Sequence, residues 1–178
     1  MKLIHQLQEV LHRPPEKQKE APAVASNAEE HTTLPENRRK RPRINARQGI
    51  RVLIIDDSPR VLTYLGKLFR SAGYVPLLAG SAERGLRMAR SEHPDLVMLD
   101  VILPGMCGFA ALRHLRRDPE VGQVPVIMMS ANEQATEQIY VKRIGADDFM
   151  KKPFTRYDLF SRIEQLLDEN RVPRRNPA

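Results

Sequence analysis

The sequence predicts an α/β fold, a doubly wound five-stranded parallel sheet with helices on both faces. Short apolar runs, of which residues 52–55 are the first, alternate with segments whose apolar residues recur at helical spacing. The runs are apolar throughout, as expected of strands that are covered on both faces. Strands and helices that alternate in this way form right-handed crossovers over a parallel sheet.

Five strand–helix pairs are predicted between residues 52 and 169. Ser58 can cap the first helix, Pro59 suits its first position, and Gly73 follows its end. The strands are expected at 52–55, near 75–78, and at 95–99, 124–128 and 147–150. The first helix is expected to begin at Ser58. The other four are expected at 81–92, about 108–117, about 134–144 and 155–169.

The predicted domain occupies residues 50–170, and 171–178 form a basic tail. Residues 13–49 are expected to be a disordered linker, because their Pro, Glu, Ala and Ser residues show no apolar periodicity. Its basic run, 38–47, holds six basic residues in ten. Residues 1–12 can form a short amphipathic helix, since five apolar residues lie there at helical spacing: Leu3, Ile4, Leu7, Val10 and Leu11.

The excess positive charge of the chain, +7, lies outside the predicted domain. Residues 51–169 hold 16 basic and 16 acidic residues, so the domain shows no basic face and nucleic acid is not the expected partner. The single cysteine, Cys107, excludes an internal disulfide and suits a reducing cytoplasm. No apolar run approaches the ~20 residues that cross a bilayer, so no membrane insertion is expected and a cytoplasmic location is predicted.

Polar side chains stand where the predicted strands end. Asp56 and Asp57 end the first strand, Asp100 the third and Ser130 the fourth, and Lys152 follows the fifth. In such a sheet the carboxyl ends of the strands form one ligand-binding edge. Clustered carboxylates call for a cation, and oxygen ligands of this kind suit Mg²⁺. A carboxylate beside a cation, an ammonium and a hydroxyl can accept a phosphoryl group, so Asp100 is predicted to be the acceptor.

Four segments closely resemble the receiver domain of response regulators in two-component signalling. They are RVLIIDDSP, DVILPGMCGF, SA at 130–131 and FMKKPF at 149–154. Their separations also match: 43 residues from Asp57 to Asp100, 30 from Asp100 to Ser130 and 22 from Ser130 to Lys152. The resemblance covers about 120 of the 178 residues and implies the flavodoxin-like receiver fold.

The resemblance implies a role for each matching residue. Asp100 would be the phosphoacceptor, and Mg²⁺ would be held by Asp56, Asp57, Asp100 and the backbone carbonyl of Ile102. Lys152 would pair with the phosphoryl group.

The resemblance also implies a switch. Ser130 would move to bond the phosphoryl group, and Phe149 would turn inward when it does. A cis peptide is expected at Lys152–Pro153. One departure is Cys107, which stands where many relatives have Asp, outside the catalytic set.

These residues also have simpler structural interpretations. Asp56 and Asp57 could cap a helix, Asp100 could form a turn, and Ser130 could cap the helix after its strand. None of these explains the whole set. A phosphatase of the haloacid dehalogenase type would need an acid where Ile102 stands, and no P-loop or dinucleotide-binding glycine motif occurs.

The predicted function is a switch that catalyses its own phosphorylation and dephosphorylation and is not an enzyme acting on other molecules. A histidine kinase or phosphotransfer protein would supply the phosphoryl group, and a separate target would bind the face made by 134–169. Two segments, GFAALRHLRRDP at 108–119 and NEQATEQIYVKRIGADDFMKKPF at 132–154, resemble receivers attached to type IV pilus, or twitching motility, systems. The alternative is a receiver whose basic N-terminal arm binds nucleic acid or another anionic partner.

Overall fold

The structure, a computed structural model, describes residues 45–131 and 145–175, which belong to one unit, Arg41–Ala178. The predicted helices at 1–12 and 134–144, and residues 13–44 of the predicted linker, lie outside the described residues. The described part contains a five-stranded sheet in the order β2-β1-β3-β4-β5, in which every pair of neighbours is parallel. The predicted sheet is therefore confirmed.

Most predicted strands and helices are confirmed to within one or two residues. The strands are β1 Arg51–Ile55, β2 Val75–Ala79, β3 Leu96–Asp100, β4 Val126–Ser130 and β5 Asp148–Lys151. The helices are α2 Pro59–Arg70, α3 Ala82–Glu92, α4 Gly108–Arg117 and α6 Arg156–Gln165. Ser58 caps α2 as predicted, since its side chain accepts from the Val61 amide, and Gly73 has a φ of 86° just after the helix.

The prediction of a helix over 155–169 is wrong at its end, because α6 stops at Gln165. The carboxylate of Asp168 accepts from the backbone amides of Asn170 and Val172, at 2.9 and 3.0 Å. These bonds favour a turn over a further helical turn. The chain then runs back, and the Arg174 amide donates to the Leu166 carbonyl over 2.8 Å.

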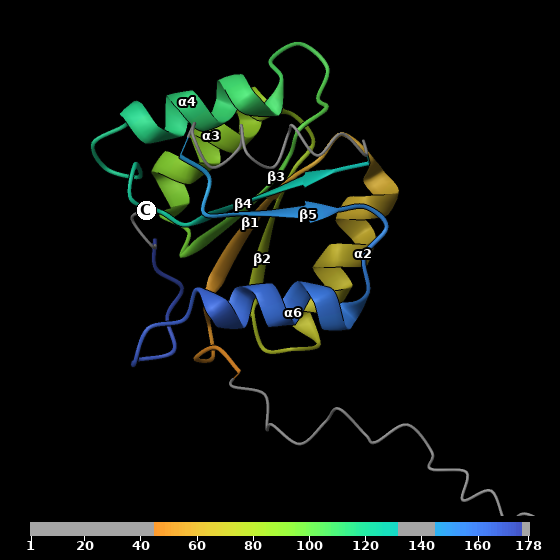
Figure 1. The fold of residues 1–178 in the computed structure, drawn as a ribbon. Coiled ribbons are helices and arrows are strands. Elements are labelled where there is room, and N and C mark those ends of the chain that lie inside the picture. The colour runs from red at the N-terminus through yellow and green to blue at the C-terminus, as the bar shows by residue number, and fades with distance from the viewer. Residues whose placement is uncertain (1–44, 132–144, 176–178) are drawn as a thin grey trace, which may run out of the picture. The chain divides into compact units, whose positions relative to one another are not determined.

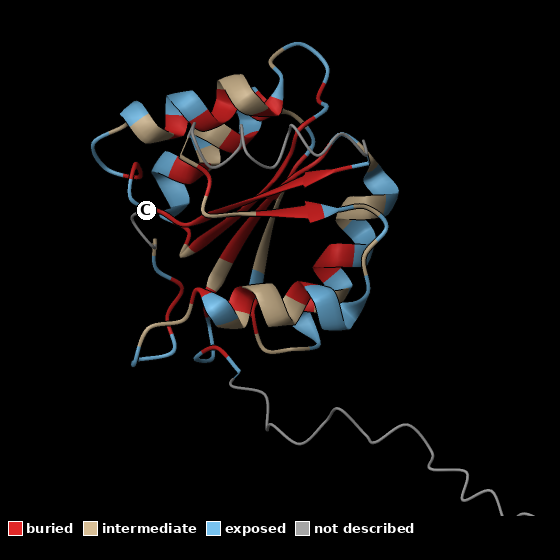
Figure 2. Cartoon of the chain, viewed as in Figure 1, coloured by how far each residue is buried: buried red, intermediate tan, exposed pale blue. Residues whose placement is uncertain are grey.

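Helices cover both faces of the sheet (Figure 1). Side chains alternate along β1, so that Leu53 and Ile55 pack with α3 and α4 while Val52 and Ile54 pack with α2 and α6. Strands β3 and β4 are buried at every position, and Figure 2 shows buried residues along the middle of the sheet. Two apolar layers therefore hold the strands, and their polar ends remain at the edge. None of the described helices is both long and apolar enough to cross a membrane.

The packed part of the chain extends beyond residues 50–170 on both sides. Ala46 and Val172 are buried in the same apolar cluster on the α2–α6 face. The Arg47 amide donates to the Arg171 carbonyl over 3.0 Å, and the Gly49 amide donates to the Gly73 carbonyl over 3.1 Å. The last residues of the predicted linker and the first residues of the predicted tail thus belong to the folded body.

A largely buried ion pair joins α4 to the start of β5. Arg116 Nη2 lies 2.8 Å from Asp147 Oδ2, and the Arg116 side chain also donates to the carbonyls of Gly145 and Val124, each over 2.7 Å. Burial lowers the pKa of Arg116 to about 10, so the guanidinium stays charged at neutral pH. The backbone amide of Val126 donates to the same Asp147 oxygen over 2.8 Å. One arginine therefore connects α4, β4 and β5.

Replacing this arginine should destabilise the fold. We expect Arg116→Met to lower the free energy of unfolding by about 3 kcal/mol, because it leaves the buried Asp147 carboxylate without its main cation. Urea denaturation followed by circular dichroism measures this. Arg113→Met, at an exposed position on the same helix, is the matched control and should change stability by no more than about 0.5 kcal/mol. Equal losses in the two variants would contradict the role of the ion pair.

Candidate functional site

The end of β1 supplies two carboxylates in different surroundings. Asp56 is fully buried, whereas Asp57 is exposed. One Asp56 oxygen, Oδ1, accepts from the Ser58 amide over 3.0 Å, where α2 begins. This bond fixes the carboxylate in the bend between strand and helix and leaves its other oxygen turned toward the site.

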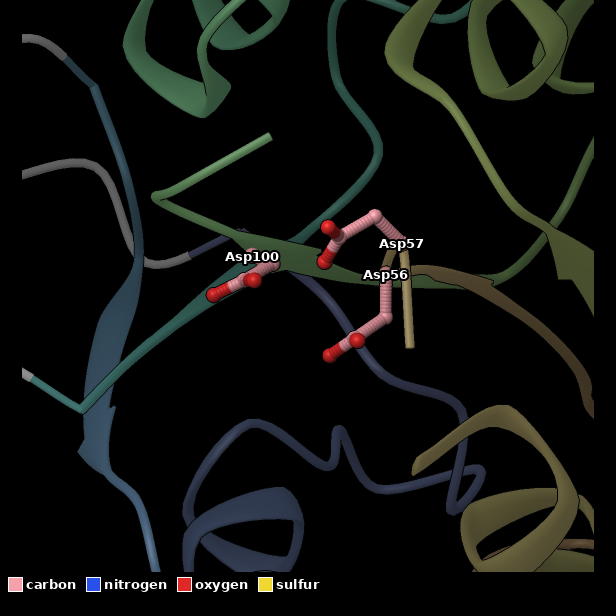
Figure 3. A group of neighbouring side chains, drawn as sticks. All are labelled: Asp56, Asp57 and Asp100. Carbon is pink, nitrogen blue, oxygen red and sulfur yellow. The ribbon is translucent and has the colours of Figure 1, made fainter. Parts of the chain in front are cut away.

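Asp100 ends the neighbouring strand β3 and is 6% exposed. Figure 3 shows its side chain beside those of Asp56 and Asp57, as the pairing of β1 with β3 requires. One oxygen from each carboxylate can be chosen so that all three lie within 4.8 Å of one another. The predicted group of three carboxylates is therefore a group in space.

Lys152 places its ammonium between two of these carboxylates. Its Nζ lies 2.7 Å from Asp56 Oδ2 and 3.0 Å from Asp100 Oδ1, and its side chain is 18% exposed. The Lys152 amide donates to the Ser130 carbonyl over 2.7 Å, which fixes the backbone from which the side chain extends. The peptide bond between Lys152 and Pro153 is cis, as expected.

The surroundings of Asp100 act on its pKa in opposite directions. Burial raises the pKa of the Asp100 carboxyl, and the charge and hydrogen bond of Lys152 lower it. The nearby Asp56 carboxylate raises it further, and the Ile102 amide lowers it by donating a hydrogen bond. The net effect is a raised pKa. Keeping Asp100 ionised in the folded protein therefore costs free energy, and a further cation would reduce this cost.

The three other predicted site residues lie close to this group in the chain or in the sheet. Ser130 is the fully buried last residue of β4. Phe149, paired in register with Met128, is 7% exposed and packs in the apolar cluster of the α3–α4 face, so its ring points inward. Ile102, two residues after Asp100, exposes 61% of its surface. The roles of Ser130 and Phe149 in switching and of the Ile102 carbonyl in metal binding remain predictions.

The carboxylates fit a magnesium ion by chemistry and by spacing. All three offer oxygen, the ligand type that Mg²⁺ prefers. Two oxygens on opposite sides of such an ion lie about 4 Å apart, because each bond is about 2.1 Å long. The observed limit of 4.8 Å requires only a small movement of the side chains. Asp57 is exposed, so the carboxylate group is open to water on that side.

Sequence reasoning assigned no role to Gly108, the first residue of α4. A Cβ atom at this position would lie 2.0 Å from the backbone carbonyl oxygen of Asp100 and 2.9 Å from the Cα of Val101. The Gly108 amide donates to the Val101 carbonyl over 3.0 Å. Only glycine lets α4 begin this close to the end of β3. The sequence signal for this requirement was the position of Gly108, shortly after the turn at Pro104 and Gly105. Cys107, before it, is exposed and makes no capping bond through its side chain.

Removing the charge of Asp100 should stabilise the metal-free protein. With a chelator present, we expect Asp100→Asn to raise the free energy of unfolding by about 1 kcal/mol, because a carboxylate is no longer buried beside Asp56. Mg²⁺ should then stabilise the original protein more than the variant, since a ligand that binds only the folded state adds to its stability. Urea denaturation with chelator and with Mg²⁺ measures both effects. An equal gain from Mg²⁺ in the two proteins would exclude Asp100 as a ligand.

Adding a methyl group at Gly108 should disturb both the fold and the site. We expect Gly108→Ala to lower the free energy of unfolding by about 2–3 kcal/mol, because backbone atoms must move away from the new Cβ. Gly80→Ala is the matched control, since a Cβ there meets no atom within 4 Å. Thermal and urea denaturation compare the two variants. If Gly108→Ala were as stable as Gly80→Ala, the close approach of α4 to β3 would not be a constraint.

Known proteins share this sequence and fold. The chain is 37% identical over 117 residues to Protein PilH of Pseudomonas aeruginosa, a match that covers 66% of this chain and 97% of that protein. It is 36% identical over 124 residues, 69% of this chain, to the DNA-binding dual master transcriptional regulator RpaA of Synechocystis. It spans 52% of RpaA and about half the length of other transcriptional regulators that it matches.

Solved structures agree with the arrangement of strands and helices. Chemotaxis protein CheY4 of Vibrio cholerae, 24% identical, superposes with a TM-score of 0.64 over 67% of this chain and 99% of that one. The receiver domain of a sensor histidine kinase from Pseudomonas aeruginosa PAO1, 30% identical, superposes with a TM-score of 0.60 over 66% of this chain and 95% of that one. That structure has a magnesium ion coordinated in the active site cleft. The family model of the response regulator receiver domain matches residues 52–164. The chain also brings its carboxylates and its lysine together at one edge of the sheet. It therefore belongs to the response regulator receiver domain family.

Proposed function

We propose that Asp100 accepts a phosphoryl group from the phosphohistidine of a histidine kinase or phosphotransfer protein. The observation that carries this proposal is the position of the Lys152 ammonium, 3.0 Å from an Asp100 oxygen and 2.7 Å from Asp56. A cation fixed at this point is already in place to face the charge of an incoming phosphoryl group. A carboxylate that only formed a turn or capped a helix would not need an ammonium group at this distance.

The transfer uses the carboxylate as a nucleophile. An Asp100 oxygen attacks the phosphorus, a P–O bond forms, and the P–N bond to the donor imidazole breaks. Lys152 stays within reach of the phosphoryl oxygens, and Asp56 holds the lysine. Asp56, Asp57, Asp100 and the Ile102 carbonyl would hold Mg²⁺, which when bound offsets the negative charge that gathers at this edge. Water later cleaves the acyl phosphate, which resets the switch.

The output is proposed to be phosphorylation-dependent binding of a separate protein. Ser130 and Phe149 would link the phosphoryl group to the face made by 134–169, of which the structure describes β5 and α6. The match to PilH over nearly its whole length and the resemblance to pilus-system receivers support a place in a motility pathway, in the cytoplasm. The alternative that a basic N-terminal arm binds nucleic acid is not favoured, since residues 51–169 hold equal numbers of basic and acidic residues.

Labelling with a small phosphodonor tests the proposal. The protein incubated with acetyl phosphate and Mg²⁺ should gain one phosphoryl group, located by mass spectrometry on the peptide that contains Asp100. Asp100→Asn should gain none, and a chelator should prevent labelling of the original protein. Asp57→Ala should slow labelling by about tenfold or more, because a ligand of the ion is lost.

Asp95→Asn is the control for these variants. Asp95 precedes β3 at the opposite end of the strand, and an asparagine keeps an oxygen that can accept from the Arg51 amide. Its labelling should be unchanged. Normal labelling of Asp100→Asn would show that another residue is the acceptor and end the proposal.

A further inference from the structure

The charges of the folded domain are unevenly distributed, although residues 51–169 hold equal numbers of basic and acidic residues. Helices α3 and α4 pack beside each other on one side of the sheet (Figure 1). The side of each helix that faces the core is buried, and the outer side is exposed. Four exposed arginines, which we call the arginine face, lie on these two helices: Arg84 and Arg87 on α3, and Arg113 and Arg117 on α4.

The fold makes little use of the four guanidinium groups. Among the described residues, the side chains of Arg84, Arg113 and Arg117 form no ion pair or hydrogen bond. Arg87 has the charge of Glu83 one turn before it, and this charge is its sole electrostatic partner in that part of the chain. Like charges three or four residues apart, as in both of these helices, destabilise a helix. The described residues do not offset this repulsion, as expected of a surface that meets an anionic partner.

The helix dipoles do not explain the four arginines either. Arg84 lies in the first turn of α3, where the dipole disfavours a cation. Arg117 lies in the last turn of α4, where the dipole favours one. The other two arginines, Arg87 and Arg113, lie in the middle of their helices, so the dipole has little effect on them.

A carboxylate of the chain itself already binds between these two helices. Asp118, just after α4, pairs with Arg90 of α3, and the Asp118 side chain is only 7% exposed. The other oxygen of Asp118 accepts from the amides of Glu120 and Val121, so this carboxylate is fixed in place. Arg90 shows that an arginine of α3 can bind a carboxylate that comes from outside its helix. The guanidinium suits such pairs, because its parallel N–H groups match the two oxygens of a carboxylate.

Acidic side chains limit the arginine face at both ends. Glu83 lies at the start of α3, Glu92 is its last residue, and Glu120 follows α4. The stretch from Glu83 to Glu92 is about 14 Å long at 1.5 Å per residue. A DNA duplex carries phosphates along its whole length and would meet these carboxylates, and so would the wide surface of an anionic membrane. A short acidic segment of a protein fits between them.

We propose that the arginine face binds a short acidic segment of a partner protein, whose Asp and Glu carboxylates pair with the four guanidinium groups. The four arginines take no part in the site at Asp100 and lie outside the face made by 134–169. The arginine face is therefore a second interaction surface of the domain. Its binding needs no phosphoryl group, and it would hold even if Asp100 were not the acceptor.

Titration of the full-length ¹⁵N-labelled chain with decaglutamate at low salt tests the proposal. The amide signals of the four arginines and of their neighbours in α3 and α4 should shift until they reach saturation. High salt should abolish the shifts, because exposed charges are screened. Decaglutamine is the matched control peptide and should shift none of these signals. Since the signals are read residue by residue, peptide bound at the basic run 38–47 does not obscure the result.

Removing charge from the face should weaken the binding. The double substitution Arg87→Gln and Arg113→Gln should raise the dissociation constant, read from the remaining α3 and α4 signals, by about fivefold or more, because two exposed ion pairs are lost. Arg60→Gln with Lys67→Gln removes the same charge from exposed positions on α2 and is the matched control. It should change the constant by less than about twofold. The urea midpoint of the face variant should not fall, since its arginines repel their neighbours in the helix.

Four outcomes would overturn the proposal. The α3 and α4 signals could stay unchanged with decaglutamate, or the two double substitutions could weaken the binding equally. A lower urea midpoint of the face variant would show that these arginines serve the fold. A short DNA duplex, or vesicles of phosphatidylcholine and phosphatidylglycerol, could move the same signals at a lower concentration than decaglutamate does, which would assign the face to phosphate groups.

Discussion

The ammonium of Lys152 between Asp56 and Asp100 is the interaction on which the site depends. It joins residues 96 positions apart in the sequence, and it lies where the ends of β1 and β3 bring two buried carboxylates together. Without a cation these carboxylates would repel each other and favour their protonated forms. The lysine favours the ionised form of Asp100, while the raised pKa of that carboxyl shows that the compensation is incomplete. A second cation beside the carboxylates would lower this remaining cost.

Much of this arrangement could be predicted from the sequence because it follows from strand order. Apolar runs that end in Asp56 and Asp100 predict buried parallel strands with carboxylates at one edge, and the structure confirms that edge. Helix caps such as Ser58 were also readable, since they depend on a few neighbouring residues.

Features that depend on tertiary contacts could not be predicted in this way. The end of α6 goes with the return of the segment that follows it, in which Val172 is buried and the Arg174 amide donates to the Leu166 carbonyl. The need for glycine at position 108 appears only when α4 is placed against the end of β3. The burial of Ala46 and Val172 shows that short flanking segments complete an apolar layer. The sequence offers no periodicity over so few residues, so only their contacts reveal the true extent of the domain.

The backbone bond between Arg47 and Arg171 has a consequence for how the chain can be rewired. It brings the entry and exit of the folded body together at the amino-terminal edge of the sheet, away from the carboxylates. A few residues could bridge these two points, and the closed loop could be reopened elsewhere as a circular permutant. The same geometry makes this edge the natural place for a purification handle or a surface tether, because cargo attached there leaves the opposite rim clear.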